Sequence, residues 1–188
     1  MQENVKDLLE EMKNLSSLML DLSYSSVFFT SKDIASEVVE LYDRIEDIEE
    51  KLTIHLLSAS REPHLAKKLV SVFEVVESAK RVASAARNMS QIVLDNKELH
   101  PIIKEALQES DERITRAIIS GSSLLANQTI GDLRLRTETG IHIIAIRRGP
   151  KWIFNPRKAT NLMKNDILIG IGPKASCRKL RRLAERRR

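Results

Sequence analysis

Two groups of residues in this sequence have side chains and a spacing suited to binding chemistry. The first group lies in the C-terminal third and comprises Ile144, Arg147, Arg148, Asn155 and Pro156. Arginine pairs with phosphate in a fork geometry, asparagine can hydrogen-bond a base edge or a ribose, and isoleucine and proline offer an apolar floor for a flat ring. The alternative is that the arginines form a solvated turn and that Asn155-Pro156 is only a corner.

The second group is a pair of carboxylates, Asp43 and Asp47, which are spaced one helical turn apart and so share one face of a helix. Carboxylate oxygens are ligands for hard cations. The alternative is an ordinary solvated acidic face, because Glu46, Glu49 and Glu50 continue the same run. This pair is therefore a candidate metal site that competes with a simpler interpretation.

The acidic pair lies within a long region of helical periodicity. Apolar residues recur every three or four positions, which predicts helices over about 3–25, from Ser31 through Leu56, and over about 63–94, with Pro63 in the first turn of the third. The same spacing predicts a fourth helix that opens at His100-Pro101 and runs to about residue 125. Short loops between long helices favour antiparallel neighbours, so residues 1 to 127 are expected to form an up-down helical bundle.

The pattern changes from helical spacing to alternation after Asn127. Strands are predicted at Leu133–Arg136, at Ile141–Ile146 and at Asp166–Ile171, with a turn at Gly149-Pro150, and a basic helix is predicted from Ser176 to Arg188. The second strand has few polar residues on either face. Because so small a unit buries little surface on its own, self-association across the sheet is the simplest way to cover it.

The two parts differ in charge as well as in pattern. Residues 1–130 carry 15 Lys+Arg and 22 Asp+Glu, a net of −7, whereas residues 131–188 carry 16 and 4, a net of +12. The fold class predicted is α+β: an all-α bundle over residues 1–128 and a small domain with a mostly antiparallel sheet over 129–188. The basic part favours an anionic partner, which could be a nucleotide, a nucleic acid, a lipid surface or the acidic helices of the same chain.

Several classes of function find little support in the sequence. No run of 18 apolar residues occurs and no export signal opens the chain, so a cytoplasmic protein without a membrane span is expected. The four histidines and the single Cys177 form no nucleophile or metal constellation, so an enzyme is not expected. No aromatic residue interleaves with the basic tail, which makes nucleic acid the less expected partner.

The C-terminal part resembles the TrkA C-terminal domain, which is the C-terminal half of the potassium-conductance regulator (RCK) domain. The matching runs are Thr139-Gly140, the I-A-I-R-R-G of residues 144–149, Asn155-Pro156 and the N-D-I-L-I-G-I-G of residues 165–172. The resemblance implies a homodimer that senses a ligand, cyclic di-AMP or another anionic nucleotide, at Ile144, Arg147, Arg148, Asn155 and Pro156. No Gly-rich dinucleotide-binding loop precedes it, so no nicotinamide response is carried over.

The helical part is similar to one repeat of the PhoU family. The runs LYDRIEDIEEKL (41–52) and VESAKRVASAARNMSQIVL (76–94) carry the likeness, including Asp43 and Asp47. The family binds metal through acidic motifs on two such helices, which here implies a divalent or iron ion at Asp43 and Asp47. However, Lys80 and Ser84 stand where the second motif has carboxylates, so half of the metal-binding pattern is missing.

Together these resemblances imply a non-enzymatic regulatory protein. Its small domain would sense a ligand, and its bundle would contact a potassium or cation transporter or channel subunit at the membrane. The alternative, from another class, is a nucleic-acid-binding protein that uses the basic C-terminal part.

Overall fold

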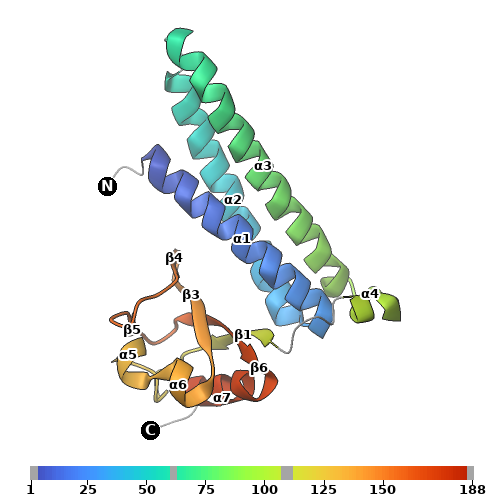
Figure 1. Ribbon diagram of the computed structural model, residues 1–188, viewed down its shortest axis with the longest axis vertical. Coiled ribbons are helices and arrows are strands. Elements are labelled where there is room, and N and C mark those ends of the chain that lie inside the picture. The colour runs from blue at the N-terminus through green and yellow to red at the C-terminus, as the bar shows by residue number, and fades with distance from the viewer. Residues whose placement is uncertain (1–3, 60–62, 107–111, 186–188) are drawn as a thin grey trace. The chain divides into compact units, whose positions relative to one another are not determined.

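The computed structural model describes residues 4–59, 63–106 and 112–185, and the chain divides into two compact units, Met1–Leu107 and Gln108–Arg188. The first unit is helical and the second combines strands with helices (Figure 1). The predicted order of a helical bundle followed by an antiparallel sheet is confirmed. Among the described residues, no helix is both long enough and apolar enough to cross a bilayer.

Three long helices build the first unit: α1 (Val5–Phe29), α2 (Lys32–Ala59) and α3 (Pro63–Leu94). Asn4 caps α1, since its side-chain oxygen accepts a 2.9 Å hydrogen bond from the backbone N–H of Asp7. The three helices pack pairwise, and α2 and α3 run side by side beyond the start of α1 (Figure 1). Their shared core is the predicted apolar stripe, including Leu8, Met12, Leu15, Met19 and Leu22 of α1, Val38, Leu41, Ile45, Ile48 and Leu52 of α2, and Val76, Ala83 and Ala86 of α3.

The predicted fourth helix is wrong over most of its length. Helix α4 spans only Pro101–Ala106, and Glu112–Ile118 forms strand β1. Ile114 and Ile118 are spaced as on a helix, but Thr115 and Ala117 are buried in alternation with their neighbours, as a strand requires. The expected boundary between residues 128 and 129 therefore gives way to one between Leu107 and Gln108, and the bundle has three long helices instead of four.

The second unit contains a four-stranded antiparallel sheet in the order β1-β6-β3-β4. Its other strands are β3 (His142–Arg148) and β6 (Ile167–Pro173), as the alternation predicted, and β4 (Lys151–Phe154), which was not among the predicted strands. The predicted turn joins β3 to β4, with Gly149 at a φ of +58° that suits glycine. A bulge interrupts the β3–β6 pairing between Ile143 and Ala145, and β2 (Gln128–Thr129) pairs with β5 (Asn161–Leu162) in a separate ribbon.

Two short helices occupy the place of the strand predicted at Leu133–Arg136. Helix α5 (Ile130–Leu133) starts at Thr129, whose hydroxyl accepts from the Asp132 N–H at 3.1 Å, and α6 (Leu135–Thr139) follows directly. Arg134 joins them with a φ of +44°, and this left-handed residue cannot belong to a regular strand. The leucines and arginines that alternate in this segment lie at the end of α5 and the start of α6, and not on a β-strand.

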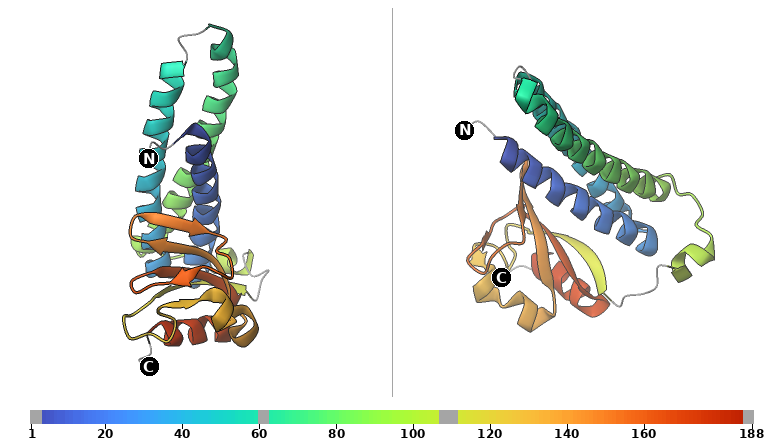
Figure 2. Two further views of the ribbon diagram at one scale, coloured as in Figure 1. Left: turned by 90° about the vertical axis from the view of Figure 1, so that its left-hand side faces the viewer. Right: turned by 45° about the horizontal axis from the view of Figure 1, so that its top comes forward.

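Helix α7 (Lys174–Glu185) covers one face of the sheet, as seen in Figure 2, and contacts β1 and β6. Cys177, Leu180 and Ala184 are buried, while its basic residues stay exposed. The helix comes close to β6 at Gly170, where an added Cβ would lie 3.3 Å from a methyl of Leu180 and 2.9 Å from one of Ile141. The predicted terminal basic helix is confirmed as far as Glu185; the rest of the prediction lies outside the described residues.

Candidate functional site

The β3–β4 hairpin carries three of the five predicted ligand-binding residues, Ile144, Arg147 and Arg148, and the other two, Asn155 and Pro156, directly follow β4. Ala145 of β3 pairs with Phe154 of β4. One residue farther from the turn, Ile144 lies opposite Asn155, and the Asn155 N–H donates a 2.9 Å hydrogen bond to the Ile144 carbonyl. Asn155 has a φ of +45°, which ends β4 and turns the chain into Pro156. Ile144, Asn155 and Pro156 therefore meet at the end of the hairpin away from its turn.

Arg147 and Arg148 lie at the other end of the same hairpin, opposite Trp152 and Lys151. Three residues of extended chain separate Arg147 from Ile144, which corresponds to roughly 10 Å. Arg147 shares a sheet face with Trp152, and Trp152 stacks with Phe154 at 6.0 Å between ring centroids. The structure thus divides the predicted set into two groups along one hairpin.

Three hydrogen bonds hold the Arg148 guanidinium within the domain. Its guanidinium forms a two-pronged ion pair with Asp166, with Nε to Oδ1 at 2.9 Å and Nη2 to Oδ2 at 2.8 Å, and also donates to the Asn161 carbonyl at 2.6 Å. Asp166 is 1% exposed and accepts a further bond from the Met163 N–H at 2.8 Å. The hydrogen bond that Arg148 donates to Asp166 raises the pKa of Arg148 above its ordinary value. The contacts give Arg148 a structural role: it ties the end of β3 to the start of β6.

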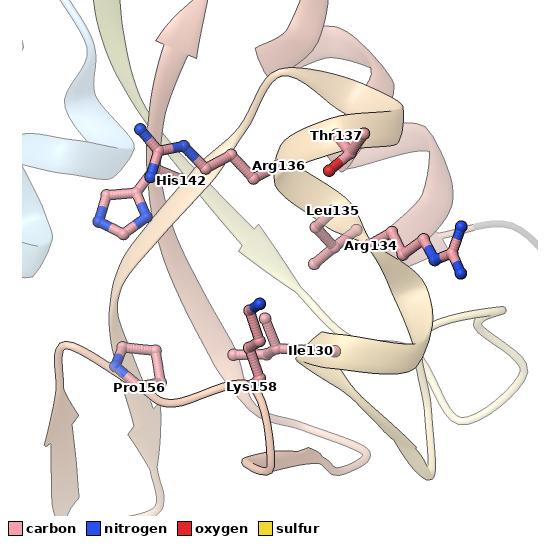
Figure 3. A pocket seen from close by; sticks show the side chains of 9 residues that line it. Ile130, Arg134, Leu135, Arg136, Thr137, His142, Pro156 and Lys158 are labelled. Carbon is pink, nitrogen blue, oxygen red and sulfur yellow. The ribbon is translucent and has the colours of Figure 1, made fainter.

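A pocket of about 490 Å³ lies beside the Pro156 end of the hairpin (Figure 3). Helices α5 and α6 form one wall, and β3 and the chain after β4 form the other. It is lined by Ile130, Gly131, Arg134, Leu135, Arg136, Thr137, His142, Pro156 and Lys158. Of the residues predicted from sequence, only Pro156 lines this pocket.

The pocket is basic at its mouth and apolar within. In Figure 3 the Arg136 side chain extends toward the His142 ring, the Lys158 side chain lies farther along the pocket beside Ile130, and Arg134 points away. Arg134 and Arg136 were not predicted as site residues because the segment Leu133–Arg136 was expected to be a strand, whereas His142 and Lys158 lie in other segments that only the fold brings to the same pocket. The available signal was the number of cations flanking the Asn155-Pro156 corner.

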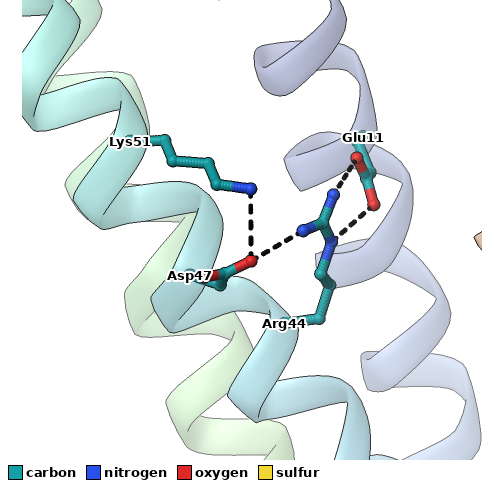
Figure 4. Close-up of polar contacts among 4 residues, drawn as sticks. All are labelled: Glu11, Arg44, Asp47 and Lys51. Atoms are coloured by element: carbon teal, nitrogen blue, oxygen red, sulfur yellow. Dashed lines mark hydrogen bonds and ion pairs between the residues drawn. The ribbon is translucent and has the colours of Figure 1, made fainter. Parts of the chain in front are cut away.

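The predicted metal pair has other partners in the bundle (Figure 4). Asp47 accepts from Arg44 at 2.7 Å and lies 3.4 Å from the Lys51 ammonium, while Arg44 also forms a two-pronged pair with Glu11 of α1, both contacts at 2.9 Å. Asp43 is exposed. Within the described part of the chain, no three acidic, histidine or cysteine side chains converge as metal ligands would. Metal binding at Asp43 and Asp47 stays a prediction.

Lys80 also has a structural partner. It forms an ion pair with Glu49, which joins α3 to α2, and the hydrogen bond that Lys80 donates to Glu49 raises the pKa of Lys80. This lysine stands where the resemblance would place a carboxylate. A cationic side chain held between two helices of the bundle is a poor neighbour for a metal ion.

The chain matches two family models that divide at the boundary between its two units. Residues 9–93 match the PhoU domain and residues 114–185 match the TrkA-C domain. The second match begins inside β1, in agreement with the division of the structure and not with the boundary expected at residue 129.

Among related proteins, the Ktr system potassium uptake protein C of Bacillus subtilis (strain 168) is 28% identical over 122 residues, which cover 65% of this chain and 52% of that protein. Potassium channel protein 1 of Methanocaldococcus jannaschii is 32% identical over 77 residues, 41% of this chain and 23% of the channel. The chain thus spans about half of the first relative and less of the second.

The solved structures that are similar include the RCK C domain of the potassium transport protein KtrA in complex with cyclic diadenosine monophosphate. It is 33% identical, covers 50% of this chain and 96% of its own, and has a TM-score of 0.36. The first family match covers most of α1 to α3 and the second covers most of the sheet and α7, so the chain carries a PhoU domain followed by a TrkA-C domain.

Proposed function

We propose that this chain is a non-enzymatic regulatory protein of a potassium or cation transport system, with a TrkA-C domain that senses an anionic nucleotide. The observation that carries the proposal is the TrkA-C match over residues 114–185. The names of two relatives, a potassium uptake protein and a potassium channel, point to the same process. The PhoU domain is the part we assign to contact with the transporter or channel subunit.

The ligand we propose is cyclic di-AMP or a similar anionic nucleotide, bound by Ile144, Asn155, Pro156 and Arg147. Ile144 and Pro156 supply apolar surface for a base, and the exposed Asn155 amide can hydrogen-bond a base edge. Arg147, which shares a sheet face with Trp152, is the arginine of this motif that we assign to phosphate, and Arg148 is assigned to its ion pair with Asp166. This assignment narrows the five residues expected from sequence to four.

A homodimer is the assembly that best suits the sheet. Residues paired across a sheet point to the same face, so Ile114 and Ile118 of β1 share a face with Trp152 and Phe154 of β4. This face is opposite the one on which α7 packs, and Ile118 is 47% exposed. Pairing of two such faces would remove apolar surface from water and bring two copies of the ligand-binding residues into one assembly.

Calorimetric titration of the full chain with cyclic di-AMP tests the proposal. We expect saturable binding that weakens about tenfold or more in Asn155→Gly, which keeps the left-handed backbone but removes the amide. Asn161→Ala, an exposed asparagine on β5, is the matched control and should bind as the natural chain does. Absence of heat at high-micromolar ligand, or full binding by Asn155→Gly, would contradict the proposed ligand site.

A second candidate function is nucleic-acid binding by the basic face of α7. Arg178, Lys179, Arg181 and Arg182 are all exposed on this helix. Lys179 also donates to the Glu138 carbonyl at 2.5 Å, which fixes the end of α6. Salt-sensitive gel shifts at physiological ionic strength that disappear in Arg178→Ala/Arg182→Ala would favour this function over the regulatory one.

A further inference from the structure

Three cationic or titratable side chains surround the pocket beside Pro156 without a carboxylate to balance them. Arg136 comes from α6, His142 from β3, and Lys158 from the chain after β4. In the described part of the chain none of the three has an ion pair or a side-chain hydrogen bond, and Figure 3 shows the Arg136 side chain of one wall next to the His142 ring of the other, with Lys158 farther along the pocket. An anion between these walls would satisfy all three.

The two walls are fixed to each other by the backbone. The Ile130 N–H donates to the Thr160 carbonyl at 3.0 Å, and the Gly131 N–H donates to the Lys158 carbonyl at 2.8 Å. An added Cβ on Gly131 would lie only 3.0 Å from that carbonyl oxygen, so glycine permits the close approach. The position of Lys158 relative to α5 is therefore set before any ligand arrives.

The interior of the pocket is apolar. Ile130, Leu135 and Pro156 line it, and Leu135 is 2% exposed and belongs to the hydrophobic core of the domain. Pockets of about 300 to 1,000 Å³ with apolar walls and a few convergent polar groups are typical of small-molecule sites. A bare inorganic anion would leave most of this surface without a partner.

We propose that this pocket binds an organic phosphate of mononucleotide size within a single subunit. The phosphate lies among Arg136, His142 and Lys158, and the flat apolar body lies against Ile130 and Pro156. This site is separate from the one proposed at Ile144 and Asn155, although Pro156 borders both. It needs no second copy of the chain.

Titration of the full chain with AMP as the probe tests this assignment. We expect saturable binding that weakens with added salt, and a loss of about tenfold or more in Arg136→Ala/Lys158→Ala, because charge-assisted hydrogen bonds are lost. The control Arg178→Ala/Arg182→Ala removes the same charge from the exposed face of α7 and should bind AMP as the natural chain does. Unchanged melting temperatures of both variants would show that the fold is intact.

Four results would overturn the assignment. These are no saturable binding of AMP at millimolar concentration, an equal loss in the α7 control, binding of adenosine as tight as that of AMP, or binding of inorganic phosphate as tight as that of AMP. Asn155→Gly separates the two sites: it should leave AMP binding unchanged while it weakens binding of cyclic di-AMP. Failure of cyclic di-AMP to bind would therefore count against the proposed function and not against this pocket.

Discussion

The PhoU domain and the TrkA-C domain use their charged residues differently. In the bundle, Arg44 joins α1 to α2 through Glu11, and Lys80 joins α3 to α2 through Glu49. In the TrkA-C domain, Arg148 is paired with the buried Asp166, while Arg136 and Lys158 line a pocket that has no carboxylate among its described residues. The comparison indicates that charges in the bundle serve its packing, whereas those beside the pocket are available to a ligand.

Loss of Asp166 should give the largest change in stability, because its carboxylate is buried and holds Arg148. We expect Asp166→Ala to lower the free energy of unfolding of the TrkA-C domain by about 3 kcal/mol. The only tryptophan of the chain, Trp152, lies in β4, so its fluorescence during urea unfolding reports on this domain. The exposed neighbour Lys164 is the control, and Lys164→Ala should change stability by less than about 0.5 kcal/mol. If Asp166→Ala lowered the free energy of unfolding by no more than the Lys164→Ala control does, the Arg148–Asp166 ion pair would not be structural.

The interhelical pair of Arg44 and Glu11 should have a smaller effect. A double-mutant cycle with Arg44→Met and Glu11→Gln should give a coupling energy of about 1 kcal/mol, since both side chains are only partly exposed and the contact is two-pronged. Far-UV circular dichroism follows the unfolding, because the long helices dominate it. Coupling near zero would show that the bundle does not depend on its ion pairs, and the contrast between the two domains would weaken.

The smallest effect is expected at Asp21 of α1, a carboxylate of the bundle that forms no ion pair with the described residues. Burial raises the pKa of Asp21 above its ordinary 3.8, although the side chain still reaches solvent. The folded state therefore holds this proton more tightly than the unfolded state, and the stability that protonation supplies is full below pH 3.8 and is lost as the pH rises through the folded-state pKa.

Asp21→Asn should accordingly raise the melting temperature slightly at about pH 7, and the gain should disappear in acid below 3.8. Glu46→Gln removes one negative charge from the exposed face of α2 and serves as the control. An equal gain in both variants would trace the effect to the net charge of the bundle and not to the surroundings of Asp21.

The sequence predicted the parts of the fold in which one period dominates. The apolar stripes of α1, α2 and α3 repeat over many turns, and β3, β6 and the Gly149-Pro150 turn follow from alternation and turn chemistry. Strand β1 was missed because Ile114, Ala117 and Ile118 fit a helical spacing as well as a pleat, and pairing with β6 decided between them. Helices α5 and α6 depend on a cap at Thr129 and a left-handed Arg134, which a repeat pattern does not reveal.

The candidate sites show a similar limit. The motif around Arg147 and Arg148 indicated a binding region, but only the fold shows that Arg148 is held by the buried Asp166. Arg136 and Lys158 are distant in sequence, and they approach one pocket because the Gly131 N–H bonds to the Lys158 carbonyl. Residue types predict which chemistry is available, and long-range backbone contacts decide where it is assembled.

Strand β1 is also the first element of the TrkA-C domain, and it is held to the sheet by one neighbour. Its seven residues pair only with β6, from Glu112 opposite Pro173 to Ile118 opposite Ile167. Tension on the chain that links the two domains would therefore act first on the hydrogen bonds between β1 and β6. Single-molecule pulling from the bundle would therefore load the β1–β6 seam before any other part of the sheet.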